Sequence, residues 1–272
     1  MAKYKKKRAR ELQHDRFRDT TMGFFDRLGE LLEGKGRTIL YGLGGLILAG
    51  LLVLVFVRWS DRKADEASEA LGRAISISTA GINPTPIPGS TEPSFATEYD
   101  RAQRAIEEFE KVAAKYGDPY QSEARYFIAA NRLVVDRAKG LTELSELSNS
   151  SVPEVAALSK FALAQAKESD GKLDEAAQLY SDLARQNSTS VTAETANLRL
   201  AKVYTKLGKK QEAVDVLFDI VKTASEAKDL EGKPVPLSPT ATTAKDKLTQ
   251  LDPEKAKELP QQPVDLDPGS LF

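Results

Sequence analysis

The chain has 272 residues, 41% of them hydrophobic and 29% charged, which is the composition of one or two globular domains and not of a disordered or fibrous chain. It has no cysteine, which excludes a disulfide scaffold, a thiolate zinc site, an iron–sulfur cluster and a lipoprotein anchor. Its single histidine, His14, lies in a basic N-terminal stretch, so one chain cannot assemble a histidine-built metal site or a Ser-His-Asp triad.

The charges are divided unevenly along the chain. Residues 1–37 carry eleven Lys/Arg and six Asp/Glu, whereas the rest of the chain carries 28 basic and 34 acidic residues. The basic cluster near the N-terminus includes Lys5, Lys6, Lys7, Arg8 and Arg10. We interpret this cluster as an orientation signal that also attracts anionic lipid headgroups, at about 1 kcal/mol per basic residue near the surface. Nucleic-acid binding is the alternative interpretation. Phenylalanines and leucines at helical spacing predict an amphipathic helix within the same segment.

An uncharged stretch follows, residues 38–57, between Arg37 and Arg58. A helix of this length covers roughly 30 Å, the hydrocarbon thickness of a bilayer, so the stretch predicts one transmembrane helix that serves as an uncleaved signal anchor. Basic residues concentrate before the span. The positive-inside rule therefore predicts a cytoplasmic N-terminus, with residues 58–272 outside the cytoplasm.

Small residues lie on one face of the predicted span. Gly42, Gly45 and Ala49 share that face, and the Gly-x-x-x-Ala spacing lets another membrane helix approach closely. The alternative is that glycine is simply common in membrane helices. The span is therefore either a recognition element or only an anchor.

Residues 58–230 show helical periodicity and no sustained strand alternation, which predicts an all-α domain without a sheet. A proline-rich loop at residues 81–93 interrupts the pattern. Two helix starts are predicted near Pro119 and Pro153. Asp118 and Ser151 are the capping side chains expected there.

Two segments of this domain repeat each other at an interval of 37 residues. The sequence GKLDEA at residues 171–176 recurs as GKKQEA at residues 208–213, and a Leu-Ala pair precedes each at the same offset. Glycine permits a tight turn, and the small Ala164 and Ala201 let two antiparallel helices approach closely. This pattern of helix, glycine turn and helix resembles the tetratricopeptide (TPR) repeat and predicts a solenoid of helical hairpins.

The concave face of such a solenoid is the expected binding surface, lined by the first helix of each hairpin. The residues expected there from their repeat offsets are Phe161, Gln165, Glu168, Leu198, Lys202 and Thr205. Interior packing is the alternative for Phe161 and Leu198. The mixed lining suits a peptide segment or a partner protein better than a small polar substrate.

The end of the chain, residues 231–272, has seven prolines. The pair Ser238-Pro239 predicts the start of one more helix, at residues 239–251, which would cap the open end of the solenoid. Beyond Asp252 the composition predicts a solvated, mobile end.

Taken in order, these elements resemble the YfgM type, the ancillary subunit of the SecYEG translocon. The features that carry the resemblance are the aromatic pair Phe24-Phe25, a single glycine-containing span followed by Trp59, and TPR-like repeats, over residues 20–228. The basic N-terminus, the loop at residues 81–93 and the C-terminal tail depart from that pattern. The resemblance implies a non-enzymatic adaptor of the bacterial inner membrane with a periplasmic domain, whose partners are SecYEG, exported polypeptides or periplasmic chaperones.

Two other classes of function stay open at this point. One is an envelope-organising scaffold for cell wall or division machinery, in which the span is only a tether. The other is a lipid- or nucleic-acid-binding protein that acts through residues 1–37. No glycine-rich phosphate loop, acid pair or metal-ligand spacing stands out, so we expect no cofactor, metal site, catalytic residue or small-molecule substrate.

Overall fold

The structure, a computed structural model, describes residues 36–83, 93–186 and 188–260, and for residues 36–40 and 43 it describes the backbone alone. The chain divides into two compact units, residues 1–66 and residues 67–272. Helix α3 (Gly36–Ser78) forms the described part of the first unit and contributes its last turns to the second. The basic cluster Lys5, Lys6, Lys7, Arg8 and Arg10 and the predicted amphipathic helix lie outside the described residues.

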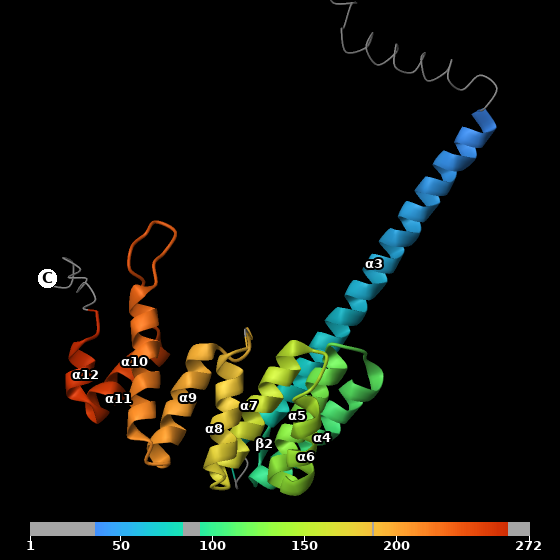
Figure 1. The fold of residues 1–272 in the computed structure, drawn as a ribbon. Helices are drawn as coiled ribbons and strands as arrows, with labels where there is room; N and C mark the ends of the chain where they lie inside the picture. Colours follow the sequence, from blue (N-terminus) through green and yellow to red (C-terminus); the bar gives the residue numbers. More distant parts are fainter. Residues whose placement is uncertain (1–35, 84–92, 187, 261–272) are drawn as a thin grey trace, which may run out of the picture. The chain divides into compact units, whose positions relative to one another are not determined.

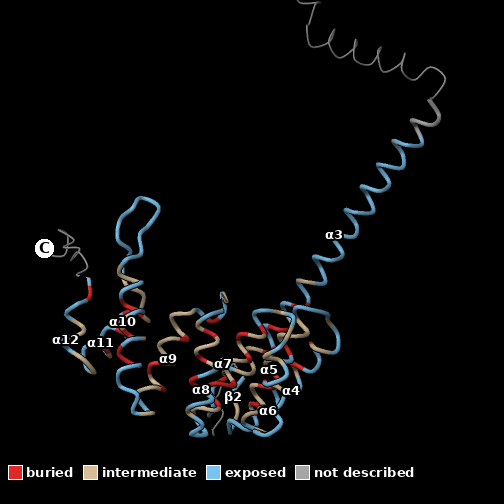
Figure 2. Tube along the Cα trace, in the orientation of Figure 1, coloured by how far each residue is buried: buried red, intermediate tan, exposed pale blue. Residues whose placement is uncertain are grey.

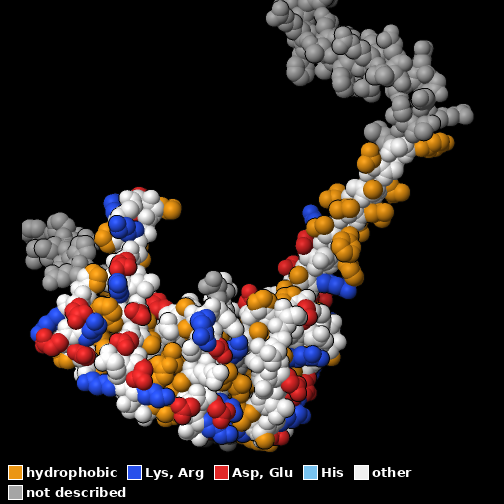
Figure 3. Space-filling view, in the orientation of Figure 1, with side chains coloured by type: hydrophobic (Ala, Val, Ile, Leu, Met, Phe, Trp, Pro, Cys, Tyr) orange, Lys and Arg blue, Asp and Glu red, His pale blue; other side chains and the backbone are white. Residues whose placement is uncertain are grey.

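The first part of α3 is apolar and exposed. The large hydrophobic side chains from Leu46 to Val57 are 46–72% exposed, and they cover this part of the helix in Figure 3. Among the described residues, α3 is the one helix long and apolar enough to cross a membrane, and none of its most apolar window is buried. Lys63 Nζ lies 3.8 Å from the centre of the Trp59 ring, just beyond the apolar stretch.

The second unit is a series of α-helices, each of which packs against the next along the chain (Figure 1). The helices are α4 (Glu98–Lys115), α5 (Tyr120–Val135), α6 (Arg137–Leu147), α7 (Pro153–Ser169), α8 (Leu173–Ala184), α9 (Ala193–Lys206), α10 (Lys210–Glu226), α11 (Pro239–Leu251) and α12 (Pro253–Lys257). The predicted all-α class and its TPR-like organisation in helical hairpins are confirmed.

The two turns that suggested a repeat have the same geometry. Gly171 and Gly208 both adopt a left-handed conformation, with φ of 74° and 73°, which glycine reaches without a steric penalty. In each turn the amide of the lysine after the glycine donates to a carbonyl five residues earlier, at 2.9 Å for Lys172 and 3.0 Å for Lys209. The α7–α8 and α9–α10 hairpins are therefore two copies of one unit.

Small residues line the contact between the helices of each hairpin, as the sequence predicts. Ala164, Ala201, Ala176 and Ala213 are all buried. Larger side chains fill the space between neighbouring helices, and the largest fully buried one is Tyr180 on α8. Figure 2 shows the buried residues on the sides of the helices that face one another. The core is thus a series of hydrophobic clusters along the helices, and partly buried side chains such as Leu179 and Val216 each contact two of them, as in other helical repeats.

The last turns of α3 belong to this core. Leu71 and Ala74 pack in one cluster with Phe109 of α4, whose ring stacks on that of Phe127 of α5 at a centroid distance of 4.8 Å. A further hydrophobic cluster joins α9, α10, α11 and the chain after α12. The second unit therefore has packed helices at both of its ends.

Two predicted helix caps are wrong in detail. Helix α7 is capped by Val152 and not by Ser151, because Pro153 at the first helical position holds the preceding residue in an extended conformation. At α5 the N-cap position is Pro119, which has no side chain to accept a bond. Asp118 instead accepts hydrogen bonds from the amide and hydroxyl of Ser122, at 3.2 and 2.5 Å.

The expectation of no sheet also needs a small correction. Strands β1 (Gly81–Ile82) and β2 (Ser94–Phe95) form a two-residue parallel pair at the ends of the proline-rich loop. The amide of Asn83 donates to the carbonyl of Phe95 at 2.9 Å.

Residues 253–260 are more ordered than their composition predicts, whereas the rest of the predicted mobile end, residues 261–272, lies outside the described residues. Asp252 caps α12 by accepting from the amide of Lys255 at 2.9 Å, and Leu259 is 8% exposed in the cluster shared with α10 and α11. A short helix forms here because it covers apolar surface that α11 leaves open, which a count of prolines does not reveal.

Candidate functional site

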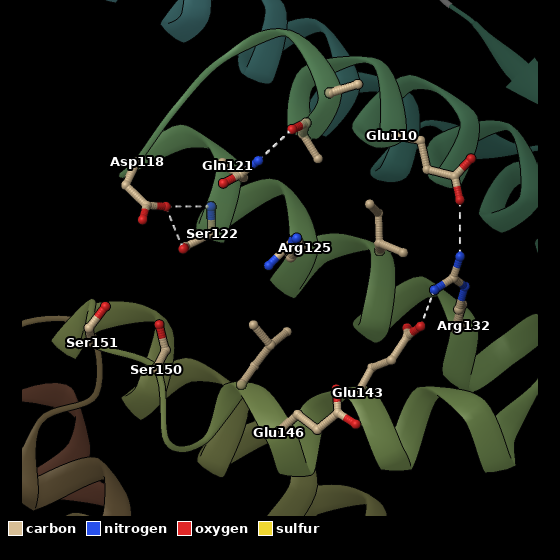
Figure 4. Close-up of a pocket in the computed structure, with 14 residues that line it drawn as sticks. Glu110, Asp118, Gln121, Ser122, Arg125, Arg132, Glu143, Glu146, Ser150 and Ser151 are labelled. Carbon is tan, nitrogen blue, oxygen red and sulfur yellow. Dashed lines mark hydrogen bonds and ion pairs between the residues drawn. The ribbon is translucent and has the colours of Figure 1, made fainter.

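A cleft of about 790 Å³ lies between α4, α5 and α6 (Figure 4). Three of its charged side chains are paired with each other. Arg132 donates to Glu110 at 3.0 Å and also contacts Glu143, so one guanidinium from α5 ties α4 to α6. We interpret the Arg132 network as structural, because an arginine held by two carboxylates has little capacity left for a ligand.

A second groove, of about 500 Å³, lies along α9 and α11. Its lining residues are Glu168, Arg199, Ala201, Lys202, Thr205, Lys206, Leu217, Lys247, Gln250 and Leu251. Four of these side chains are basic and one is acidic. The groove is thus positive, although the chain beyond position 37 is acidic as a whole.

Helical spacing brings the basic residues together. Arg199, Lys202 and Lys206 stand three and four residues apart on α9, so they share one face of that helix. Lys247 comes from α11, which packs against α9. More than forty residues separate Lys247 from Lys202 in the sequence. The apolar floor is formed by Ala201, Leu217 and Leu251.

The one acidic residue of the groove already has its partners. Lys206 Nζ lies 2.6 Å from one oxygen of Glu168, and the hydroxyl of Tyr180 donates to the other at 3.2 Å. The Glu168 side chain is 12% exposed. Glu168 and Lys206 therefore neutralise each other at one end of the groove.

The other three cations have no acidic partner within hydrogen-bond or ion-pair distance among the described residues. The Arg199 guanidinium lies over the Phe161 ring, 6.0 Å from its centre. Partial burial lowers the pKa of Lys202, and the positive charges of Arg199 and Lys247 lower it further, while Glu168 partly opposes them. An anion placed between these side chains would relieve their mutual repulsion.

The structure places three of the six predicted concave-face residues in this groove: Glu168, Lys202 and Thr205. Phe161 packs edge-on against Tyr180 at a centroid distance of 5.7 Å, and Leu198 packs against the core cluster of α10 and α11. Gln165 does not line the groove. Arg199 and Lys247 were missed, although the spacing of Arg199 from Lys202 was available in the sequence.

The small residues of the predicted span lie on an exposed helix. A Cβ atom at Gly42 or Gly45 would meet nothing within 4 Å in the described chain, and Ala49 is exposed. Within residues 36–83, 93–186 and 188–260, no three His, Cys, Asp or Glu side chains are grouped so that they could hold a metal ion.

No protein-family model matches this chain, and no curated protein matches it. Among solved structures, the chain is similar to a Podosopora anserina putative kinesin light chain with nearly identical TPR-like repeats, at 19% identity and a TM-score of 0.42. A single-residue variant of that protein is similar at 18% identity and a TM-score of 0.43. Both alignments cover 58% of this chain and 81% of the other. The TPR-like assignment rests on the hairpin geometry described above.

Proposed function

We propose that this protein is a non-enzymatic membrane-anchored adaptor, and that the groove along α9 and α11 binds an acidic segment of a partner protein. The observation that carries the proposal is the set of three cations, Arg199, Lys202 and Lys247, that face the same groove without an acidic partner among the described residues. Like charges held together are unfavourable unless a ligand of opposite charge compensates them.

The shape and lining of the groove favour a peptide as this ligand. An open groove with basic walls and an apolar floor offers charge-assisted bonds to carboxylates and apolar contact to the side chains between them. Two successive repeat hairpins and α11 build it, so a bound segment would lie across several helices. A small polar substrate would instead need an enclosed site with convergent polar groups.

The proposed anchor is the first part of α3. Twelve residues of exposed apolar surface, from Leu46 to Val57, are unfavourable in water and suit a bilayer. The excess of basic residues before the span favours a cytoplasmic N-terminus in a bacterial inner membrane, with the helical unit in the periplasm. By resemblance, the proposed partners are SecYEG at the membrane helix and exported polypeptides or periplasmic chaperones at the repeats.

The triple variant Arg199→Gln, Lys202→Gln and Lys247→Gln tests the groove. Each partly exposed ion pair contributes roughly 0.2–1 kcal/mol, so the loss of three should lower capture of the partner about tenfold. Partners are captured by crosslinking in membranes and identified by mass spectrometry. The matched control is Lys210→Gln, Lys222→Gln and Lys245→Gln, which removes three exposed lysines outside the groove. Equal capture by the two triple variants would refute the proposed binding site.

The double variant Gly45→Leu and Ala49→Leu tests whether the span recognises a membrane partner. Both changes raise hydrophobicity, so insertion should persist, but close approach of a second helix should be lost. We expect co-purification of SecYEG to fall, whereas Gly44→Leu with Gly50→Leu, on other faces of the helix, should leave it unaltered. Protease added to spheroplasts should digest the helical unit in every variant. Unaltered co-purification would favour the scaffold hypothesis, and a protected helical unit would reverse the orientation.

A further inference from the structure

We propose that the groove along α9 and α11 is also bound by the chain's own C-terminal segment, residues 261–272, which thereby competes with the partner. This inference goes beyond the proposed function, because it concerns an occupant within the same chain. It rests on the place where the described chain ends, on charge complementarity, and on the length of the segment.

The described chain ends in a hydrophobic cluster that shares three residues with the groove. Leu259, the last buried residue of the described chain, packs in the same hydrophobic cluster as Ala201, Leu217 and Leu251. Those three residues are also the apolar floor of the groove. The segment that begins at Gln261 therefore starts two residues after a side chain that packs in the same cluster as the groove floor.

The segment carries the charge that the groove lacks. Its sequence, QQPVDLDPGSLF, has two aspartates, and from Leu259 to Phe272 the chain has no lysine, arginine or histidine. The groove presents Arg199, Lys202 and Lys247 with no acidic partner among the described residues. Two carboxylates facing three cations would make charge-assisted bonds that the cations do not have among the described residues.

The spacing of the segment suits the groove. In an extended chain, alternate side chains point to opposite sides, so Asp265 and Asp267 share one side and Val264 and Leu266 the other. Pro268 favours an extended conformation at the residue before it. The aspartates are then about 7 Å apart, close to the separation of about 5–6 Å between residues three apart on a helix, such as Arg199 and Lys202.

A short tether joins the segment to the described chain. Eight residues connect Leu259 with Asp267, and an extended chain of that length covers up to about 26 Å. A short tether of this kind gives a local concentration on the order of millimolar, so a weak contact is sufficient to fill the groove for much of the time. A partner with a stronger acidic segment would displace it.

The absence of cysteine makes the proposal testable by crosslinking within the full-length protein in detergent. Ser270→Cys is combined with Thr205→Cys, which lines the groove, or with Thr249→Cys, which is exposed on α11 outside it. A flexible bismaleimide is then added. We expect the Thr205 pair to crosslink within one chain about five- to tenfold faster, since each exposed pair of opposite charges contributes roughly a factor of two to five.

Asp265→Asn with Asp267→Asn should reduce the rate for the Thr205 pair to that of the Thr249 pair, as should molar salt. Gln261→Asn with Gln262→Asn is the neutral control and should change nothing. Reversal of Arg199 and Lys202 to Glu should abolish the preference, and Asp265→Lys with Asp267→Lys should restore it.

Equal rates for the two cysteine pairs, or rates indifferent to the aspartates, would overturn the proposal. A crosslink that joins two chains and depends on protein concentration would also overturn it, in favour of binding to a second copy. The outcomes for the two proposals are separable. Loss of partner capture in the groove variants without a tail crosslink supports the adaptor function alone, and a tail crosslink without partner capture supports the intramolecular contact alone.

Discussion

Replacement of Gly140 by alanine is expected to destabilise the helical unit by about 3 kcal/mol. Gly140, on α6, lies against the backbone of α5. A Cβ atom there would stand 2.7 Å from the amide nitrogen of Leu133, 2.9 Å from the carbonyl carbon of Arg132 and 3.0 Å from the carbonyl oxygen of Ala129. Backbone atoms of a packed helix cannot rotate away as a flexible side chain can, so α5 and α6 must separate.

The matched control is Gly72→Ala, another glycine inside a helix. A Cβ atom at Gly72 would meet nothing within 4 Å, and alanine is favoured over glycine in a helix by up to about 1 kcal/mol. We expect this variant to be as stable as the parent chain or slightly more stable. Urea unfolding followed by far-UV circular dichroism measures both variants. Equal midpoints would show that α5 and α6 do not approach as closely as described.

Tyr180→Ala is expected to cost about 3–5 kcal/mol, the range for removal of a large buried aromatic side chain. Tyr180 is fully buried between α7, α8 and α9, and its hydroxyl donates to Glu168 in the groove. Tyr180→Phe keeps the ring and removes only that donor, so we expect a cost of about 1 kcal/mol. The same urea series separates the two contributions. A phenylalanine variant as unstable as the alanine variant would contradict the assignment of this residue to core packing.

The pH dependence of stability provides a second test of Tyr180. Burial and the nearby Glu168 raise the pKa of Tyr180 above its ordinary value. The unfolded chain then loses the phenolic proton more readily than the folded chain, so stability should fall as the pH rises above about 10, the ordinary tyrosine pKa. Part of this loss of stability at alkaline pH should be absent in Tyr180→Phe. If both proteins lost the same stability at alkaline pH, Tyr180 would be excluded as a cause of the pH dependence.

The helical hairpins could be predicted because their signals are local. A glycine that adopts a positive φ, an apolar stripe with a period of 3.6 residues, and small residues at a fixed offset each act within one or two turns of the chain. The prediction therefore identified the turns at Gly171 and Gly208 and the buried Ala164 and Ala201. The caps at Asp118 and Ser151 were wrong by one residue, because proline chemistry next to the cap decides the helix boundary.

The candidate site could be predicted only in part. Of the six residues expected from repeat offsets, Glu168, Lys202 and Thr205 line one groove. The offsets could not show that Lys247 from α11 completes the cationic wall, or that Phe161 and Leu198 pack against core clusters. Offsets describe positions on one helix, whereas the composition of a groove depends on which later helix packs beside it.

By itself, the sequence of this protein determined the class of fold, the apolar stretch of α3 and the two repeated hairpins, because these follow from composition and short-range periodicity. Only the tertiary structure decided which charges are neutralised, as with Glu168 by Lys206, and which are left facing a groove. It also decided that Gly140 has no room for a side chain and that Leu259 is buried although it lies in a proline-rich segment. These features depend on contacts between residues far apart in the chain, and local patterns carry no information about such contacts.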